Sequence, residues 1–182
     1  MRVIAGSARS LVLKAPKGDH TRPTLDKHKE TLFNCLQSDI VYSVFVDLFA
    51  GTGSIGIEAL SRGAARAYFV DNNNEAVKYI KDNLQTTKLV DKAYVFKEDV
   101  HTFLKTGLKE HADIVFMDPP FKGGEYRSVF EILKESEFID EDTVIVAESG
   151  IEEDFGFLDE LGFEIYKNKE YKTCKHVFIH KA

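Results

Sequence analysis

Residues 44–58 read Val-Phe-Val-Asp-Leu-Phe-Ala-Gly-Thr-Gly-Ser-Ile-Gly-Ile-Glu, an apolar run followed by a glycine-rich turn and the start of a helical pattern. Gly51, Gly53 and Gly56 fit the spacing G-x-G-x-x-G, in which glycines allow a sharp turn and a close approach of backbone to a ligand. The stretch therefore predicts a strand–turn–helix unit of an α/β fold, with a nucleotide-like cofactor at the turn. A plain strand-to-helix turn without a ligand stays an alternative.

Two acids bear on which cofactor this turn binds. Asp71 closes the next apolar run twenty positions after Gly51, where a carboxylate can hold two ribose hydroxyls. That spacing alone fits NAD. Asp47, however, precedes the first glycine, where a carboxylate faces an ammonium group better than a pyrophosphate. S-adenosylmethionine contains an ammonium group and no phosphate, so we expect it as the cofactor.

From residue 44 onward, apolar runs alternate with helical patterns, which is typical of βαβ units and a mostly parallel sheet. We expect strands at residues 44–49, 66–71, 93–97, 112–118, 143–148, 163–168 and 174–181. We expect helices at residues 54–62, 73–86, 99–106, 126–135 and 154–161. The last two strands follow each other through a short polar linker, which predicts an antiparallel C-terminal hairpin. The predicted fold class is α/β.

The N-terminal part of the chain differs in charge from the rest. The whole chain of 182 residues has a net charge of −6, but residues 1–30 hold seven basic and three acidic residues, a local balance of +4. Such a basic end can attract a polyanion to one face of an acidic body. The alternative is a solvated arm without a role. The candidate RNA contacts are Arg2, Arg9, Lys14 and Arg22.

Residues 2–14 alternate between apolar and basic types around a small turn, which predicts a short β-hairpin. Thr24 is expected to cap a following helix, whose apolar positions include Leu32 and Phe33. We therefore divide the chain into a basic hairpin extension, residues 1–23, and one α/β domain, residues 24–182.

The bulk composition excludes several classes of protein. With 43% hydrophobic and 30% charged residues, the chain is typical of a globular protein, and no apolar run reaches the length of a membrane helix. The first residues lack the apolar core of a signal peptide, so we expect a cytoplasmic protein. Cys35 and Cys174 have no metal-ligand spacing, and His176 and His180 lie too far apart on an expected strand to share an ion, so we expect no metal.

The fourth expected strand ends in Asp118-Pro119-Pro120-Phe121. Ligands of open α/β sheets bind beyond the carboxyl ends of the strands, and this strand should lie beside residues 44–49, so Asp118 should face the glycine turn. Two prolines make the backbone rigid and remove two N–H donors, which leaves carbonyl acceptors for an amine. Asp118 and the Pro119 carbonyl can accept from its two N–H groups and aim the nitrogen lone pair at a methyl group, while Phe121 stacks on a base.

These motifs resemble those of S-adenosylmethionine-dependent amino methyltransferases, whose signature is Asp/Asn-Pro-Pro-aromatic. Together with Met1–Gly6, Arg22-Pro23-Thr24 and Glu30–Asn34, they resemble more closely the RsmD family of 16S rRNA guanine-N2 methyltransferases. The resemblance spans nearly the whole chain.

The resemblance implies a Rossmann-like, seven-stranded methyltransferase fold, S-adenosylmethionine as cofactor and a guanine of 16S rRNA, within an assembled or partly assembled small subunit, as substrate. The implied catalytic residues are Asp118, Pro119, Pro120 and Phe121. The implied cofactor-binding residues are Asp47, Phe49, Ala50, Gly51, Gly53, Asp71, Asn72, Asp99 and Val100. Asp99 matches the family position that meets the adenine amino group, and it is equally a candidate helix N-cap.

The chain departs from the family pattern at Ser10, His28 and Lys29, and a lysine cannot reproduce a bidentate arginine contact. These departures bear on RNA contacts more than on the reaction.

Two rival functions stay open. One is an adenine-N6 DNA methyltransferase, for which 182 residues leave little room for target recognition. The other is a nicotinamide-binding oxidoreductase or a non-catalytic nucleotide-binding module.

Overall fold

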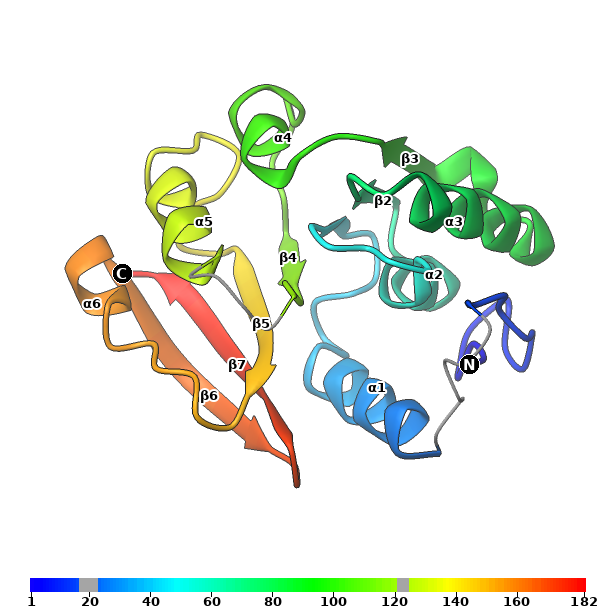
Figure 1. Ribbon diagram of the computed structural model, residues 1–182, viewed down its shortest axis with the longest axis horizontal. Coiled ribbons are helices and arrows are strands. Elements are labelled where there is room, and N and C mark those ends of the chain that lie inside the picture. Colours follow the sequence, from blue (N-terminus) through cyan, green and yellow to red (C-terminus); the bar gives the residue numbers. More distant parts are fainter. Residues whose placement is uncertain (17–22, 121–124) are drawn as a thin grey trace.

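The computed structural model describes residues 1–16, 23–120 and 125–182, without the side chains of residues 23–25. Seven strands form one sheet in the order β3-β2-β1-β4-β5-β7-β6 (Figure 1). The strands are β1 Val44–Asp47, β2 Arg66–Val70, β3 Ala93–Phe96, β4 Ile114–Met117, β5 Val144–Gly150, β6 Phe163–Glu170 and β7 Cys174–Lys181. The helices are α1 Pro23–Cys35, α2 Ser54–Ser61, α3 Asn74–Thr87, α4 Val100–Thr106, α5 Glu125–Lys134 and α6 Leu158–Leu161, with a 3₁₀ turn at Val90–Lys92.

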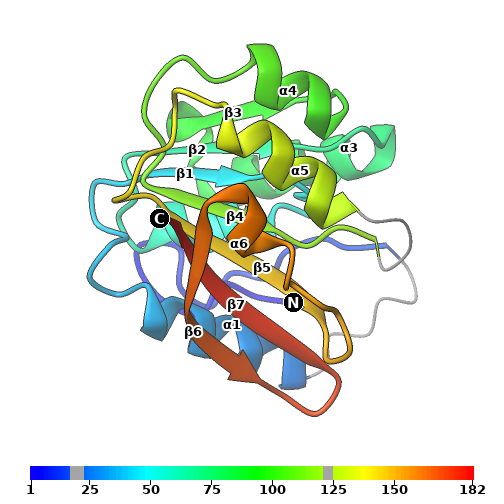
Figure 2. The same ribbon diagram turned by 90° about the vertical axis from the view of Figure 1, so that its left-hand side faces the viewer.

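Strands β1 to β5 pair in parallel, whereas β7 is antiparallel to both β5 and β6. In the view turned by 90°, β5, β7 and β6 run side by side across the molecule (Figure 2). The predicted fold class is therefore confirmed, including the antiparallel C-terminal hairpin.

Helices cover both faces of the sheet, which explains why the central strands are apolar on every residue rather than on alternate ones. On one face, α1, α2 and α3 contribute Phe33, Ile57 and Ile80 to a core cluster. On the other face, α4 and α5 contribute Phe103 and Phe130 to a second cluster. Figure 1 shows the two groups of helices on opposite sides of the strands.

Three local expectations were wrong. The helix expected at 154–161 begins only at Leu158, because the Asp154 side chain accepts a hydrogen bond from the Gly156 N–H and forms a turn there. Thr24 is not an N-cap, since the helix already includes Pro23, a residue favoured in the first helical turn. Strand β4 ends at Met117 rather than Asp118, and Pro119 has no N–H with which to extend the ladder.

The predicted N-terminal hairpin is reduced to one antiparallel bridge between Arg2 and Val12. The neighbouring backbone groups bind α2 instead: Ile4 and Ala5 donate their N–H groups to the buried carboxylate of Glu58, at 2.8 and 3.0 Å. Gly6 has a φ of +82°, and a Cβ there would lie 1.7 Å from the Ser61 carbonyl oxygen. The start of the chain is thus packed directly against α2.

Over the described part of the chain, no helix has both the length and the apolar composition needed to cross a membrane.

Candidate functional site

The candidate site lies where β1 and β4 end side by side. Asp47, the last residue of β1, pairs with Phe116 of β4, so Asp118 follows two residues beyond that pair at the same edge of the sheet. This adjacency was predicted from the sequence, because a parallel sheet brings the carboxyl ends of its strands together. The two motifs therefore face one cleft although they are far apart in the sequence.

The glycine turn joins β1 to α2. Gly53 has a φ of +78° and precedes the first residue of α2, a conformation in which a side chain is strained. Gly56 has a different role, since a Cβ there would lie 2.4 Å from the Phe69 ring of β2. The third glycine therefore allows α2 to pack closely on the sheet.

Asp71 stabilises this turn from the end of β2. Its two carboxylate oxygens accept hydrogen bonds from the N–H groups of Gly51 and Asn73, each at 2.8 Å. Each oxygen retains a second lone pair, which leaves room for a ribose hydroxyl. The geometry gives Asp71 a structural contact that the sequence motif alone does not reveal.

Asp47 is buried, with 1% of its surface exposed. Its Oδ2 atom accepts from the Gly56 N–H at 3.1 Å, while Oδ1 has no hydrogen-bond partner within the described residues. Burial, opposed by the Gly56 bond and reinforced by the charge of Asp71, raises the Asp47 pKa to about 7. A buried acceptor without a partner beside a cleft fits a ligand that brings an ammonium or another N–H donor.

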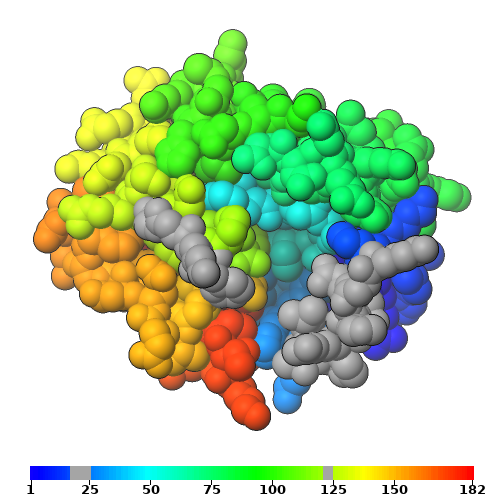
Figure 3. All heavy atoms as spheres, viewed as in Figure 1, coloured from blue at the N-terminus to red at the C-terminus, as the bar shows by residue number. Residues whose placement is uncertain are grey.

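A cleft of about 340 Å³ opens above the strand ends. In Figure 3 the surface is hollowed between the cyan residues of β1 and α2 and the red residues of β7. Of the residues predicted from the sequence, Asp47, Phe49, Ala50, Gly51 and Asp118 line this cleft.

A second cleft, of about 420 Å³, shares part of its lining with the first. The predicted residues that line it are Phe49, Gly51, Asp71, Asn72, Asp99, Val100, Asp118, Pro119 and Pro120. The structure thus distributes the candidate residues over two adjoining clefts that share Phe49, Gly51 and Asp118. Gly53 lines neither, and Phe121 lies outside the described residues.

Asp99 caps α4, as its alternative interpretation predicted. Its Oδ1 atom accepts from the N–H groups of His101 and Thr102, at 2.9 and 3.4 Å. The side chain still borders the second cleft, so capping leaves its other oxygen available.

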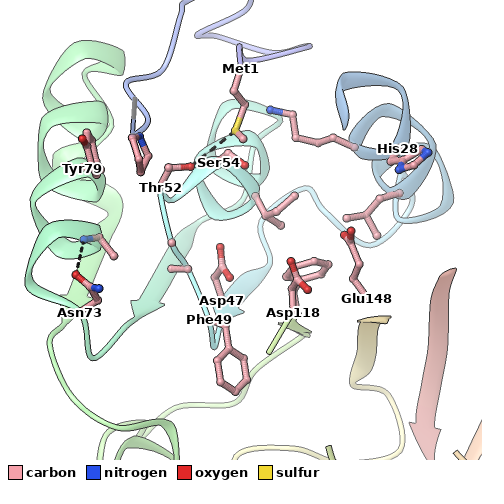
Figure 4. A pocket seen from close by; sticks show the side chains of 18 of the residues that line it. Met1, His28, Asp47, Phe49, Thr52, Ser54, Asn73, Tyr79, Asp118 and Glu148 are labelled. Carbon is pink, nitrogen blue, oxygen red and sulfur yellow. Dashed lines mark hydrogen bonds between the residues drawn. The ribbon is translucent and has the colours of Figure 1, made fainter. Parts of the chain in front are cut away.

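Asp118 stands between two other acids. Figure 4 shows Asp47, Asp118 and Glu148 in this order across the pocket, with His28 beyond Glu148. Burial, followed by the negative charges of Glu148 and Asp47, raises the Asp118 pKa to about 8. The pocket is therefore rich in acceptors and favours a ligand that brings N–H donors or positive charge.

Sequence reasoning missed Glu148 and His176, which both line the first cleft. They face each other across the β5–β7 ladder, and the His176 Nε2 atom lies 2.9 Å from the Glu148 Oε2 atom. Glu148 is near the carboxyl end of β5, beside β4, so the strand-end rule that identified Asp118 could have identified it. The sequence analysis considered His176 only as a metal ligand and did not consider a hydrogen bond from it to a carboxylate.

The candidate RNA contacts lie on the N-terminal segment, whose Met1 and Pro16 border the first cleft. Arg2 is 3.3 Å from Asp26 and Lys14 is 3.0 Å from Asp82, although both basic side chains are more than half exposed. Arg9 is exposed in a groove beside Arg2, and Arg22 lies outside the described residues.

The departure at Lys29 has a structural explanation. Its side chain is only 5% exposed, pairs with Glu58 at 3.4 Å and donates to the Arg2 carbonyl oxygen at 2.7 Å. Burial nevertheless lowers the Lys29 pKa, an effect that Glu58 opposes. Lys29 therefore anchors the N-terminal segment beside the first cleft, with little of its side chain exposed.

Among residues 1–16, 23–120 and 125–182, no group of three or more His, Cys, Asp or Glu side chains is placed to hold a metal ion. Cys35 and Cys174 are both free thiols.

The family model described as conserved hypothetical protein 95 matches residues 1–180. The chain is 40% identical over 150 residues to YlbH of Bacillus subtilis, described as a candidate rRNA methyltransferase, covering 81% of this chain and 82% of that protein. It is 36% identical over 152 residues to ribosomal RNA small subunit methyltransferase D of Escherichia coli, covering 84% and 76%. The structure of yhhF from Escherichia coli, described as a candidate methyltransferase, has a TM-score of 0.87 and 30% identity, covering 100% of this chain and 97% of that one.

Proposed function

The chain belongs to the family described as conserved hypothetical protein 95, the RsmD family, and we propose that it is a ribosomal RNA methyltransferase. More specifically, we propose that it transfers a methyl group from S-adenosylmethionine to the exocyclic N2 of a guanine in 16S rRNA. The observation that supports this most is the meeting of Asp47, with its unpartnered buried oxygen, and Asp118 at one cleft.

The two adjoining clefts suit the two halves of the cofactor. Asp71 and Asp99 would hold the ribose and the adenine in the second cleft, where Val100 supplies an apolar contact. Asp47 would accept from the ammonium group at the first cleft. The cofactor supplies an electrophilic methyl group on a positively charged sulfur, which the surrounding carboxylates stabilise electrostatically.

Asp118 and the Pro119 carbonyl would hold the acceptor amine. When both accept from its N–H groups, the nitrogen lone pair leaves conjugation with the ring and points at the methyl carbon. With the cofactor bound, the amine nitrogen would form a bond to the methyl carbon as the C–S bond breaks and its electron pair stays on sulfur, and the amine proton would leave along its hydrogen bond to Asp118 and then to solvent. The protein contributes position and charge here rather than a covalent intermediate.

Recognition of RNA is assigned to the basic N-terminal extension, residues 1–23, beside the methyltransferase domain, residues 24–182. One small acidic domain with a single basic edge offers little surface for reading sequence, since specific nucleic-acid interfaces bury about 1,000 Å² or more. We therefore propose that the substrate is an assembled or partly assembled small subunit, in which the target base is already displayed.

The test is transfer of a tritium-labelled methyl group to purified small subunits, protein-free 16S rRNA and duplex DNA, followed by nucleoside analysis. The proposal expects N2-methylguanosine, with much faster labelling of subunits than of free rRNA. N6-methyladenine in DNA would identify the rival methyltransferase instead. Stabilisation against thermal unfolding by NAD, without stabilisation by S-adenosylhomocysteine, would favour an oxidoreductase.

A further inference from the structure

One side of the first cleft is formed by Glu148, His176 and His28, and Tyr171 contacts both histidines without lining the cleft itself. We call these four side chains the acid–histidine cluster. The Tyr171 hydroxyl lies 3.1 Å from the His176 Nδ1 atom, and the Tyr171 ring stacks on His28 with a centroid separation of 3.9 Å. The cluster joins β5, β7, the β6–β7 turn and α1 at the position where Figure 4 shows Asp118, Glu148 and His28 around the pocket.

The Glu148 carboxylate is held in a defined position. His176 is only 1% exposed and its Nε2–H donates to the Glu148 Oε2 atom at 2.9 Å, while Tyr171 donates to Nδ1, which is the consistent assignment for a neutral imidazole. The Glu148 backbone carbonyl accepts from the Tyr126 hydroxyl at 2.5 Å. The first contact orients the Glu148 carboxylate, and the second holds the backbone of Glu148 in place.

One oxygen of Glu148 remains available to a ligand. The Glu148 side chain is 21% exposed, and its Oε1 atom has no hydrogen-bond partner in the described part of the chain. Met117 pairs with Ala147 in the β4–β5 ladder, so Asp118 and Glu148, the residues that follow them, lie side by side at the first cleft (Figure 4). Two adjacent carboxylates repel each other unless a ligand brings donors to both.

Guanine has a matching edge. Its ring N1–H and its N2 amino group are neighbouring donors, whereas adenine presents an acceptor at N1 beside its amino group. Resting on the proposed function, we propose that Glu148 accepts from the ring N1–H of the target guanine while Asp118 accepts from its amino group. His176 is then a positioning residue that orients Glu148, and the pair selects guanine over bases that lack the ring N–H.

The test uses 2-aminopurine, which retains the amino group of guanine but has an unprotonated N1. The guanine that the enzyme methylates is first located in 16S rRNA, and small subunits are then assembled with either guanine or 2-aminopurine at that position. Initial rates of tritium-methyl transfer are measured for wild type and for Glu148→Gln, whose amide can donate to an unprotonated N1. Thermal unfolding and affinity for S-adenosylhomocysteine show that the variant is folded.

We expect wild type to prefer guanine by about tenfold or more, the effect of a hydrogen bond to a charged acceptor. Glu148→Gln should lose most of this preference by becoming slower on guanine and relatively faster on 2-aminopurine. If Glu148→Gln slows both substrates equally, the inference is overturned while the proposed function stands. If wild type labels no guanine at all, the proposed function fails, and the inference with it.

His176 is tested by its conservative replacement. His176→Gln keeps an N–H donor for Glu148 and should keep the base preference, whereas His176→Ala should lower the preference toward that of Glu148→Gln. A role in stability alone predicts that both variants retain the wild-type ratio of the two rates, and that result would contradict the positioning role.

Discussion

The two halves of the cleft are built in different ways. The half proposed to hold the cofactor comes mostly from one continuous stretch, β1 to the end of β2, to which the start of α4 adds Asp99 and Val100. Within that stretch, the Asp71 carboxylate accepts a hydrogen bond from the Gly51 N–H of the glycine turn. The half proposed to hold the base comes from β4, β5, β7 and α1, in which Asp118, Glu148 and His28 are distant in sequence. A binding site built from neighbouring residues is visible as a sequence motif. A binding site assembled from several strands can be recognised only when the order of those strands in the sheet is known.

The largest expected effect comes from a substitution that should impair methyl transfer without impairing cofactor binding. Asp118→Ala should lower methyl transfer by about 10²- to 10³-fold, because the amine loses the hydrogen-bond acceptor that orients its lone pair in the transition state. Affinity for S-adenosylmethionine, measured by calorimetry, should stay within a few-fold of wild type. Near-wild-type turnover would remove Asp118 from the catalytic assignment, and a collapse of cofactor affinity would show that the halves are not separable.

The close packing behind the glycine turn is tested by Gly56→Ala. A Cβ 2.4 Å from the Phe69 ring must displace either the ring or α2, which we expect to cost about 1 to 3 kcal/mol of unfolding free energy. Gly150→Ala is the control, because a Cβ there meets nothing within 4 Å. Chemical denaturation of both variants gives the comparison, and equal stabilities would mean that α2 tolerates a shift.

Asp71→Ala should weaken S-adenosylmethionine binding by about 1 to 3 kcal/mol, the scale of hydrogen bonds to a charged group. Because Asp71 also accepts from the Gly51 and Asn73 N–H groups, the variant should lose stability as well. Asp71→Asn keeps one acceptor oxygen and serves as the intermediate case. If calorimetry finds unchanged affinity for the alanine variant, Asp71 has only the structural role.

The acidic side chains in the half of the cleft proposed to hold the guanine predict that the stability of the protein depends on pH. A carboxyl pKa raised to about 8 means that the folded state binds the Asp118 proton more tightly than the unfolded state does, so this group lowers stability as pH rises from about 4 to about 8. Asp118→Asn removes that loss. Its melting temperature should exceed that of wild type by a few degrees at pH 8 and by less at pH 5, and a constant difference would contradict the shift.

The smallest effect concerns the N-terminal segment. Replacing Arg2, Arg9 and Lys14 together by alanine should weaken binding to small subunits. The log–log slope of affinity against salt should flatten by about 0.7 to 0.9 for each RNA phosphate that is no longer neutralised. Arg127→Ala is a control, since this exposed arginine lies on α5 and pairs with Glu131 and Glu160. An unchanged slope would leave the segment a structural element of the fold, packed on α2.

The sequence by itself determined the fold class, the order of strands and helices along the chain, and the two motifs. These features depend on apolar periodicity and glycine spacing, which are local and can be read from neighbouring residues. It also predicted that Asp118 lies at the same edge of the sheet as Asp47, since parallel strands end at one edge. Only the tertiary structure revealed that Glu148 and His176 face each other in neighbouring strands and that Lys29 is buried against Glu58. The physical reason for the first is strand register, because side-chain packing on both faces of the sheet decides which residues of β5 and β7 lie opposite each other. The reason for the second is that a charged side chain is buried only beside a partner, and that partner can be far away in the sequence.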